Sequence, residues 1–186
     1  PKGRRLVQRW LAEAWFALRP GGSLFLAGAK DQGVQPAIRD ASQLFGLPAV
    51  LDYAKGNRVV RWVKRSAENL PTASEPGPAQ GAWLASPGVA PGTWQRLEIS
   101  TPRGSLALFS LPGVFSSDQL DEGTALLLDH LLVEPGRRVL DLGCGYGVIG
   151  ILAAQSGAAR VDMLDNSLLA VACAQETLTD NHLSNA

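Results

Sequence analysis

Four glycines and an aspartate lie close together in the segment VLDLGCGYGVIG, residues 139 to 150. Read from Gly145, this segment has the G-x-G-x-x-G spacing of a dinucleotide-binding loop, and Asp165 lies where that fingerprint places a ribose-binding acid. Read from Asp141, the same letters give D-x-G-x-G-x-G, with glycines at 143, 145 and 147. The two readings imply different cofactors.

The charge of Asp141 separates the two readings. A dinucleotide carries a pyrophosphate with two negative charges, and two unit charges a few ångströms apart repel by about 4 kcal/mol at an effective dielectric near 20. S-adenosylmethionine instead carries a sulfonium and an ammonium beside one carboxylate, so an acid attracts it. Glycines let the backbone approach the methionine and ribose closely, while Asp165 and the adjacent Asn166 are placed to bind the sugar. The second reading therefore favours S-adenosylmethionine.

Regular elements must hold this loop in place. After residue 93, strands are predicted at residues 94–100, 106–111, 138–142 and 160–164, and helices at 123–133, 148–155 and 167–180. The order strand, glycine loop, helix, strand, helix is typical of the opening of a doubly wound parallel sheet. Pro135-Gly136 and Gly157 end the helices that precede the two parallel strands.

The first 65 residues also have an α/β pattern, but with a different order. Helices are predicted at residues 6–18 and 36–45, a short buried strand at 23–28, and a hairpin of strands at 49–53 and 58–63. This order is expected for the closing portion of an α/β sheet. Residues 66–93 hold five prolines, four glycines and six alanines without Lys or Arg, which predicts a linker on which Trp83 and Leu84 dock to a neighbouring part.

The net charge of zero conceals a segregation. Residues 1–65 hold twelve basic residues against four acidic ones, a balance of +8, and the rest of the chain balances this with −8. This asymmetry is typical of a basic part that faces a polyanion, although an evenly solvated basic surface is the alternative. On and just after the predicted hairpin, Arg58, Arg61 and Arg65 are the candidate contacts to such a polyanion. Trp62 between them is either a stacking ring or a core residue.

No membrane span, export signal or metal-ligand spacing is visible in the sequence. The two cysteines, Cys144 and Cys173, are expected to be reduced thiols, so a cytoplasmic location is predicted. The chain begins with Pro1 rather than Met, which suggests a piece of a longer protein.

Three stretches together resemble the small-type class I methyltransferases that methylate the exocyclic amine of guanine in ribosomal RNA. These stretches are PGVFSSDQLDEGTALLL, VLDLGCGYGVIG and VDMLDNSLLAVACAQETLTDN. Members of this family carry two methyltransferase-like domains in tandem, the first degenerate and the second catalytic. The stretch PKGRRLVQRWLAEAWFALRPGGSLFLAGAKDQGVQPAIRDA resembles the later half of the degenerate domain.

The resemblance implies an α/β, Rossmann-like class I fold in which the chain covers the end of one domain and the start of another. Residues 1–65 would be the C-terminal part of the degenerate domain, 66–93 the linker, and 94–186 the N-terminal part of the S-adenosylmethionine-binding domain. The implied partner is ribosomal RNA or a ribosomal subunit.

The resemblance also implies which residues bind the cofactor. Asp141, Gly143, Gly145 and Gly147 would line its methionine end, and Asp165 would hold the ribose. The set is completed by two neighbours in these loops and by an upstream segment that closes over the cofactor: Cys144, Asn166, Phe115, Asp121, Gly123 and Thr124. The upstream residues also have structural readings, in which Phe115 is core, Asp121 and Thr124 cap a helix, and Gly123 forms a turn.

The family's Asn-Pro-Pro-Phe-type tetrad, which grips the guanine amine, has no match, since no Asn-Pro or Asp-Pro-Pro occurs in the chain. The chain is therefore expected to carry a cofactor half-site with no catalytic residue, and His130 and His182 are not candidate bases. In the intact protein the amine would displace the sulfonium methyl directly. The alternatives are a non-catalytic RNA-binding or assembly module with this fold, and an NAD-dependent oxidoreductase.

Overall fold

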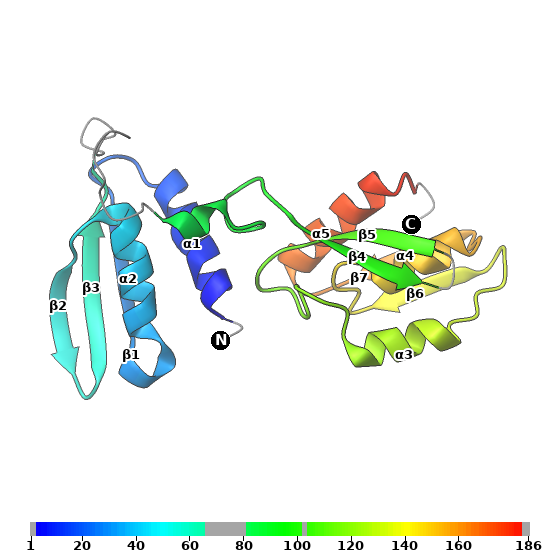
Figure 1. Cartoon of the computed structure of the whole chain (residues 1–186), viewed down its shortest axis with the longest axis horizontal. Coiled ribbons are helices and arrows are strands. Elements are labelled where there is room, and N and C mark those ends of the chain that lie inside the picture. Colours follow the sequence, from blue (N-terminus) through cyan, green and yellow to red (C-terminus); the bar gives the residue numbers. More distant parts are fainter. Residues whose placement is uncertain (1–2, 66–80, 102–103, 184–186) are drawn as a thin grey trace. The chain divides into compact units, whose positions relative to one another are not determined.

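The computed structural model describes residues 3–65, 81–101 and 104–183 of the chain. The chain divides into two compact units, Pro1–Thr93 and Trp94–Ala186 (Figure 1). Each unit has a hydrophobic core of its own, so each is described by itself.

The first unit is a three-stranded antiparallel sheet with two helices. Its elements are α1 (Arg4–Ala17), β1 (Ser23–Ala29), the short 3-10 helix η1 (Lys30–Gln32), α2 (Val34–Phe45), β2 (Ala49–Ala54) and β3 (Asn57–Val63). β3 lies between β1 and β2 and runs antiparallel to both, with Val60 opposite Leu26 of β1. Each of the five predicted elements begins and ends within two residues of its expected bounds.

Trp62 lies at the centre of the first unit's core. The side chain is 1% exposed and packs with Phe45 and Val60. Its indole Nε1–H donates to the carbonyl oxygen of Gly46 at 3.2 Å and to the hydroxyl of Ser42 at 3.3 Å. A buried indole needs such a partner, and here the end of α2 supplies it. Trp62 is therefore a core residue, and the stacking alternative is wrong.

The prediction of a buried strand at residues 23–28 was also wrong for one face of β1. Leu24 and Leu26 pack toward the core, whereas Phe25 between them is 60% exposed. Strand alternation sends successive side chains to opposite faces, and both helices of the unit pack on the face that carries Trp62 and Val60. The continuous apolar run at residues 23–28 therefore does not mean that both faces of β1 are covered.

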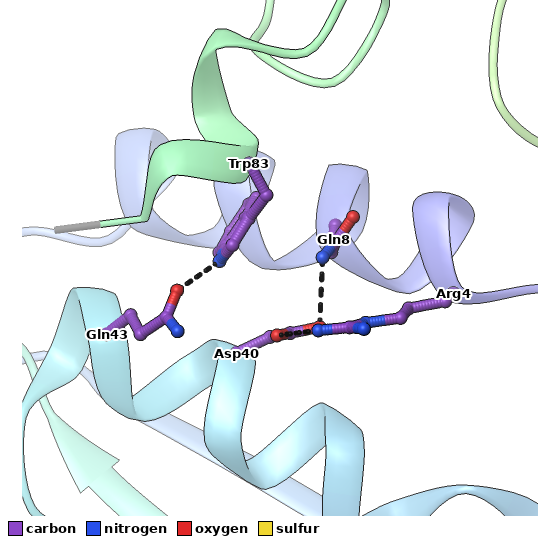
Figure 2. Close-up of polar contacts among 5 residues, drawn as sticks. All are labelled: Arg4, Gln8, Asp40, Gln43 and Trp83. Atoms are coloured by element: carbon purple, nitrogen blue, oxygen red, sulfur yellow. Dashed lines mark hydrogen bonds and ion pairs between the residues drawn. The ribbon is translucent and has the colours of Figure 1, made fainter. Parts of the chain in front are cut away.

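Residues 81–93 fold against the first unit. The 3-10 helix η3 (Ala82–Ala85) brings the Trp83 ring to the core, and its indole N–H donates to Gln43 Oε1 at 2.7 Å (Figure 2). Further along, the guanidinium groups of Arg5 and Arg9 on α1 donate to the carbonyl oxygens of Pro87 and Gly88. These contacts fix the segment on α1 and α2. The remainder of the predicted linker, residues 66–80, lies outside the described residues.

The second unit opens with a hairpin and continues as alternating helices and strands. Its elements are β4 (Gln95–Thr101), β5 (Gly104–Ser110), α3 (Glu122–His130), β6 (Arg138–Leu142), α4 (Val148–Gln155), β7 (Arg160–Leu164) and α5 (Leu168–Asp180). β4 and β5 pair antiparallel, whereas β6 and β7 pair in parallel with Val139 opposite Val161. The turn predicted between β4 and β5 includes residues 102 and 103, which lie outside the described residues.

Helix α4 is apolar on every side and is buried accordingly. Ile151 and Leu152 pack with Leu106 and Leu108 of β5 and with Cys173 of α5 in one core cluster. Because α4 starts directly after the glycine loop, this packing fixes the position of the loop. Within the described residues no helix is long and apolar enough to cross a membrane.

Candidate cofactor site

The glycine loop turns the chain from β6 into α4 through three left-handed residues. Gly143, Gly145 and Gly147 have φ values of 77°, 56° and 88°, a region in which a side chain is strained. The backbone N–H groups of Gly143 and Cys144 donate to the carbonyl oxygen of Leu164, at 2.8 and 3.0 Å. The loop is thereby held at the carboxyl end of β7. This edge of a parallel sheet is where open α/β folds bind ligands.

The four glycines are needed for different reasons. A Cβ atom built on Gly143 or Gly145 meets no other atom within 4 Å, so the space beside both residues is open. A Cβ on Gly150 would instead lie 2.3 Å from the sulfur of Met163, because α4 crosses β7 closely at this point. The last glycine of the dinucleotide spacing is thus explained by helix–strand packing. Because a dinucleotide-binding loop uses its last glycine for the same packing, Gly150 does not distinguish the two cofactors.

Asp141 is a buried carboxylate at the end of β6. It is 6% exposed, and its Oδ2 accepts a hydrogen bond of 2.9 Å from the backbone N–H of Gly150, in the first turn of α4. Burial raises the pKa of Asp141, the bond from Gly150 lowers it, and the charge of Asp165 raises it further. Among the described residues no group donates to the other oxygen, Oδ1.

Asp165 lies on the opposite side of the loop, directly after β7. Its Oδ2 accepts from the backbone N–H of Gly145 at 2.9 Å, and its Oδ1 accepts from the backbone N–H of Ser167 at 2.8 Å. Each carboxylate oxygen can accept a second hydrogen bond, so a ligand hydroxyl could still donate here. The neighbouring Asn166 is exposed.

The two acids make the loop an electronegative site. No ion pair among the described residues includes Asp141 or Asp165. Both carboxylates act on the same thiol, since burial together with the charges of Asp141 and Asp165 raises the pKa of Cys144 to about 11. A bound cation would supply the missing countercharge, whereas a pyrophosphate would add to the repulsion. No group of three or more His, Cys, Asp or Glu residues in the described chain could hold a metal ion.

The upstream segment contributes the start of α3. Asp121 is the N-cap, with Oδ1 accepting from the backbone N–H of Thr124 at 2.9 Å. Hydrogen bonding from the side chain of Thr124, and then from its backbone, lowers the pKa of Asp121. Gly123 lies in the first turn of the helix. The capping function anticipated for Asp121 and Thr124 is therefore present. Phe115 is 75% exposed, so its reading as a core residue is wrong.

Tyr146 connects α3 with the glycine loop and was not among the predicted site residues. Its side chain is 4% exposed, in the same core cluster as Leu128 of α3. Burial raises the pKa of Tyr146 to about 12, and the charge of Asp121 contributes to the rise, so the cap of α3 lies near the loop. Tyr146 could have been noticed in the sequence because it is the only aromatic residue within the glycine loop. The side chain of Cys144 is also buried, and its carbonyl oxygen accepts from the N–H of Gly147, so it shapes the loop.

Comparison with known proteins identifies relatives over the whole chain. Residues 105–186 match the family model described as Methyltransferase small domain. The ribosomal RNA small subunit methyltransferases C of Pseudomonas paraeruginosa (strain PA7) and Pseudomonas putida (strain KT2440) are each 38% identical over 184 residues, which cover 98% of this chain and 50% of the relative. The chain thus spans about half the length of the curated relatives that it matches.

A solved structure agrees with the sequence relatives. It is the T. thermophilus 16S rRNA N2 methyltransferase (RsmC), solved in complex with AdoMet and guanosine. It has 32% sequence identity and a TM-score of 0.76, and the match covers 99% of this chain and 46% of that chain. The predicted α/β, Rossmann-like fold is confirmed by this match. Residues 105–186 therefore match the methyltransferase small domain family, and nearly the whole chain is similar in sequence and structure to ribosomal RNA methyltransferases.

Proposed function

We propose that the chain is part of an S-adenosylmethionine-dependent methyltransferase that acts on the exocyclic N2 amine of a guanine in small-subunit ribosomal RNA. The observation that carries the cofactor assignment is the pair Asp141 and Asp165, two carboxylates bonded to the backbone of the glycine loop without a described cation beside them. Two carboxylates without a described countercharge would attract the positively charged sulfonium and ammonium of S-adenosylmethionine. The substrate assignment is supported by the names of the relatives and by the AdoMet and guanosine of the structural neighbour.

The residues fit the cofactor in a consistent order along the loop. Asp141 Oδ1 would accept from the ammonium or face the sulfonium, and the open space beside Gly143 and Gly145 would admit the methionine portion. Asp165 would accept from the ribose hydroxyls with its remaining lone pairs, and Asn166 would contact the sugar or the adenine edge. The other residues assigned to the site line or close the loop: Gly147, Cys144, Phe115, Asp121, Gly123 and Thr124.

The bound cofactor supplies an electrophilic methyl group on its sulfonium. The described residues would hold the cofactor: Asp141 would balance its positive charge, and backbone N–H groups at the start of α4 would be available to its methionine carboxylate. The chain contains no match to the tetrad that would position the guanine amine. Its contribution to the reaction is therefore to hold one of the two reactants in place, and another part of the intact protein holds the other.

In this proposal residues 1–65 are the closing part of the degenerate domain, residues 66–93 are the linker, and the second unit opens the cofactor-binding domain. Because the substrate is a component of the ribosome, the protein would work in the cytoplasm. The oxidoreductase alternative is disfavoured because the buried carboxylate of Asp141 would repel a pyrophosphate, whereas the packing of Gly150 against Met163 is compatible with either cofactor.

Calorimetry on a protein that contains this chain, extended to the length of its relatives, tests the proposal. We expect binding of S-adenosylmethionine and of its demethylated product but not of NADH. Asp141→Asn keeps an acceptor for the Gly150 N–H and removes the charge, so it should weaken binding of the methionine cofactor at least about tenfold, or 1.4 kcal/mol. Asp162→Asn is the matched control, because Asp162 is an acid on β7 that is paired with Arg160 at the surface.

Three results would contradict this proposal. NADH binding without binding of the methionine cofactor would support the oxidoreductase. Cofactor binding that is lost equally in Asp141→Asn and Asp162→Asn would show that the charge of Asp141 has no specific role. A protein that binds ribosomal RNA but neither cofactor would be the assembly module.

A further inference from the structure

Four basic residues of the first unit stabilise its fold through internal contacts. Arg4 donates to both oxygens of Asp40, which is 1% exposed and also accepts from Gln8 (Figure 2). The other three donate to backbone carbonyl oxygens: Arg5 and Arg9 on residues 87 and 88, and Lys64 on residues 15 and 18. The charge of these side chains remains, but their donors are used within the fold, so fewer cationic groups are free to bind a partner than the sequence suggests.

Part of the positive charge of the first unit lines a groove at one end of the sheet. The groove has a volume of about 530 Å³ and lies where β2 starts and β3 ends. Its charged lining residues are Arg61, Lys64 and Arg65, and no Asp or Glu among the described residues lines it. Arg61 and Arg65 are both exposed, whereas the Lys64 ammonium is bonded internally. Two cations are thus available to an anionic ligand.

Arg61 is held in one orientation. Its Nε–H donates to Ser23 Oγ at 3.1 Å, and its guanidinium lies 5.7 Å from the centroid of the Phe25 ring. No described residue accepts from either of its Nη groups. An arginine that is fixed by Nε and presents both Nη groups is suited to bidentate recognition of a phosphate. Arg58 is different, since it stacks over Tyr53 at 5.2 Å and does not line the groove.

The groove also has an exposed apolar wall. Leu47 is 89% exposed and Val63 is 43% exposed, and both line the groove with the two arginines. An exposed leucine is thereby placed beside two available arginines. A duplex would offer such a groove only phosphates, whereas an unpaired strand offers phosphates and an apolar base face together.

We propose that this groove binds an unpaired segment of RNA, with phosphates on Arg61 and Arg65 and a base against Leu47 and Val63. The choice of RNA as the polyanion rests on the proposed function. The contact that the sequence suggested, at the edge of the hairpin with Trp62 as a stacking ring, is thereby moved to this groove.

Fluorescence anisotropy with a labelled, unstructured RNA of about a dozen nucleotides tests the groove at several salt concentrations. Each phosphate contact on a single strand contributes about 0.7 to the slope of log K against log salt. Arg61→Ala with Arg65→Ala should therefore lower the slope by roughly 1.4 and weaken binding. The matched control is Lys30→Ala with Arg39→Ala, which removes the same charge from exposed positions of the same unit outside the groove.

Leu47→Ala separates base contacts from phosphate contacts. Because Leu47 is almost fully exposed, this variant should fold normally. We expect it to weaken binding of the unpaired RNA severalfold with the salt slope unchanged, and to leave binding of a duplex of equal length unchanged.

Three results would overturn the groove proposal. These are equal losses in the arginine and control variants, an unchanged affinity in the arginine variant, and displacement of the RNA by polyglutamate at equal charge, which would indicate an acidic protein partner. Calorimetry with S-adenosylmethionine on the same variants keeps the two proposals apart. If cofactor binding fails but the arginine effect stands, the proposed function is wrong and the groove remains. If the cofactor binds and the arginine effect is absent, only the groove is wrong.

Discussion

At the scale of single residues, the site contains a group that folding alone does not favour. Asp141 is buried, carries no described countercharge, and has a raised pKa because burial disfavours its ionised form. A neutral acceptor would satisfy the Gly150 N–H equally well. Keeping a charge at this position therefore reduces stability, which is common for binding sites that are prepared for a ligand.

Asp141→Asn should raise the free energy of unfolding of the ligand-free protein, by up to roughly 1 kcal/mol. The gain should be present at neutral pH, where the wild-type carboxylate is ionised. It should shrink as the pH falls through the raised pKa toward the ordinary value of 3.8, because a protonated carboxyl carries no buried charge. Urea denaturation across this pH range measures the effect. A loss of stability at pH 7 would show that the carboxylate is needed by the fold.

Gly150 has a packing role that a double-mutant cycle can measure. Ala is favoured over Gly in a helix by about 1 kcal/mol, but a Cβ here would lie 2.3 Å from Met163 Sδ and 2.6 Å from its Cγ. Since Met163 must move its Cγ as well as its end, Gly150→Ala should be destabilising by about 1 kcal/mol despite the helix preference. In a Met163→Ala background the same change should become stabilising. Equal effects in both backgrounds would exclude the contact.

At the scale of elements, the sequence located β6, α4 and β7 to the residue, because Pro135-Gly136, the glycine loop and Gly157 mark their ends. Helix α3 was predicted to reach Val133 but ends at His130. Beyond His130 the chain is extended, because Leu131 and Val133 are half-buried and Leu132 between them is 95% exposed. In a short apolar run, the sequence alone does not distinguish such an extended segment from a helix.

The site itself was predicted less completely than the elements. Spacing identified Asp141, Asp165 and the glycines, since loop conformation and strand ends are local properties. It could not show that Asp165 bonds to the Gly145 N–H or that Tyr146 packs beside α3, because both depend on contacts between segments. Arg61 was likewise a candidate only because of its charge, since the groove that it lines is formed by separate segments of the chain.

The contact between α1 and α2 depends on the buried carboxylate of Asp40 (Figure 2). Arg4→Met would leave this carboxylate with Gln8 as its only described donor, and an uncompensated buried charge costs about 3 kcal/mol. Asp40→Asn should cost less, because it retains an acceptor and Arg4 is half-exposed to water. Thermal denaturation should rank Arg4→Met below Asp40→Asn, with exposed Arg39→Ala near wild type. The reverse order would mean that the ion pair adds little.

At the scale of the whole chain, two units of opposite charge carry different parts of the proposed chemistry. The basic unit offers a cationic groove, and the acidic unit offers an electronegative loop for a cationic cofactor. A net charge of zero would have hidden both features. Charge therefore indicates binding sites in this chain only when it is counted separately for each unit. Within a unit, the informative residues are those that are not already bonded within the fold.

The 186-residue chain alone should not transfer methyl groups, whichever RNA is offered. Displacement at the sulfonium needs the amine within about 3.5 Å of the methyl and in line with it, and this positioning contributes on the order of 7–11 kcal/mol. The chain has no Asn-Pro or Asp-Pro-Pro with which to hold the amine. A radiolabel transfer assay with small-subunit RNA, run beside an intact relative as the positive control, measures this. Turnover by the chain alone would show that its own residues grip the guanine, and would require a catalytic site among the residues assigned here to cofactor binding.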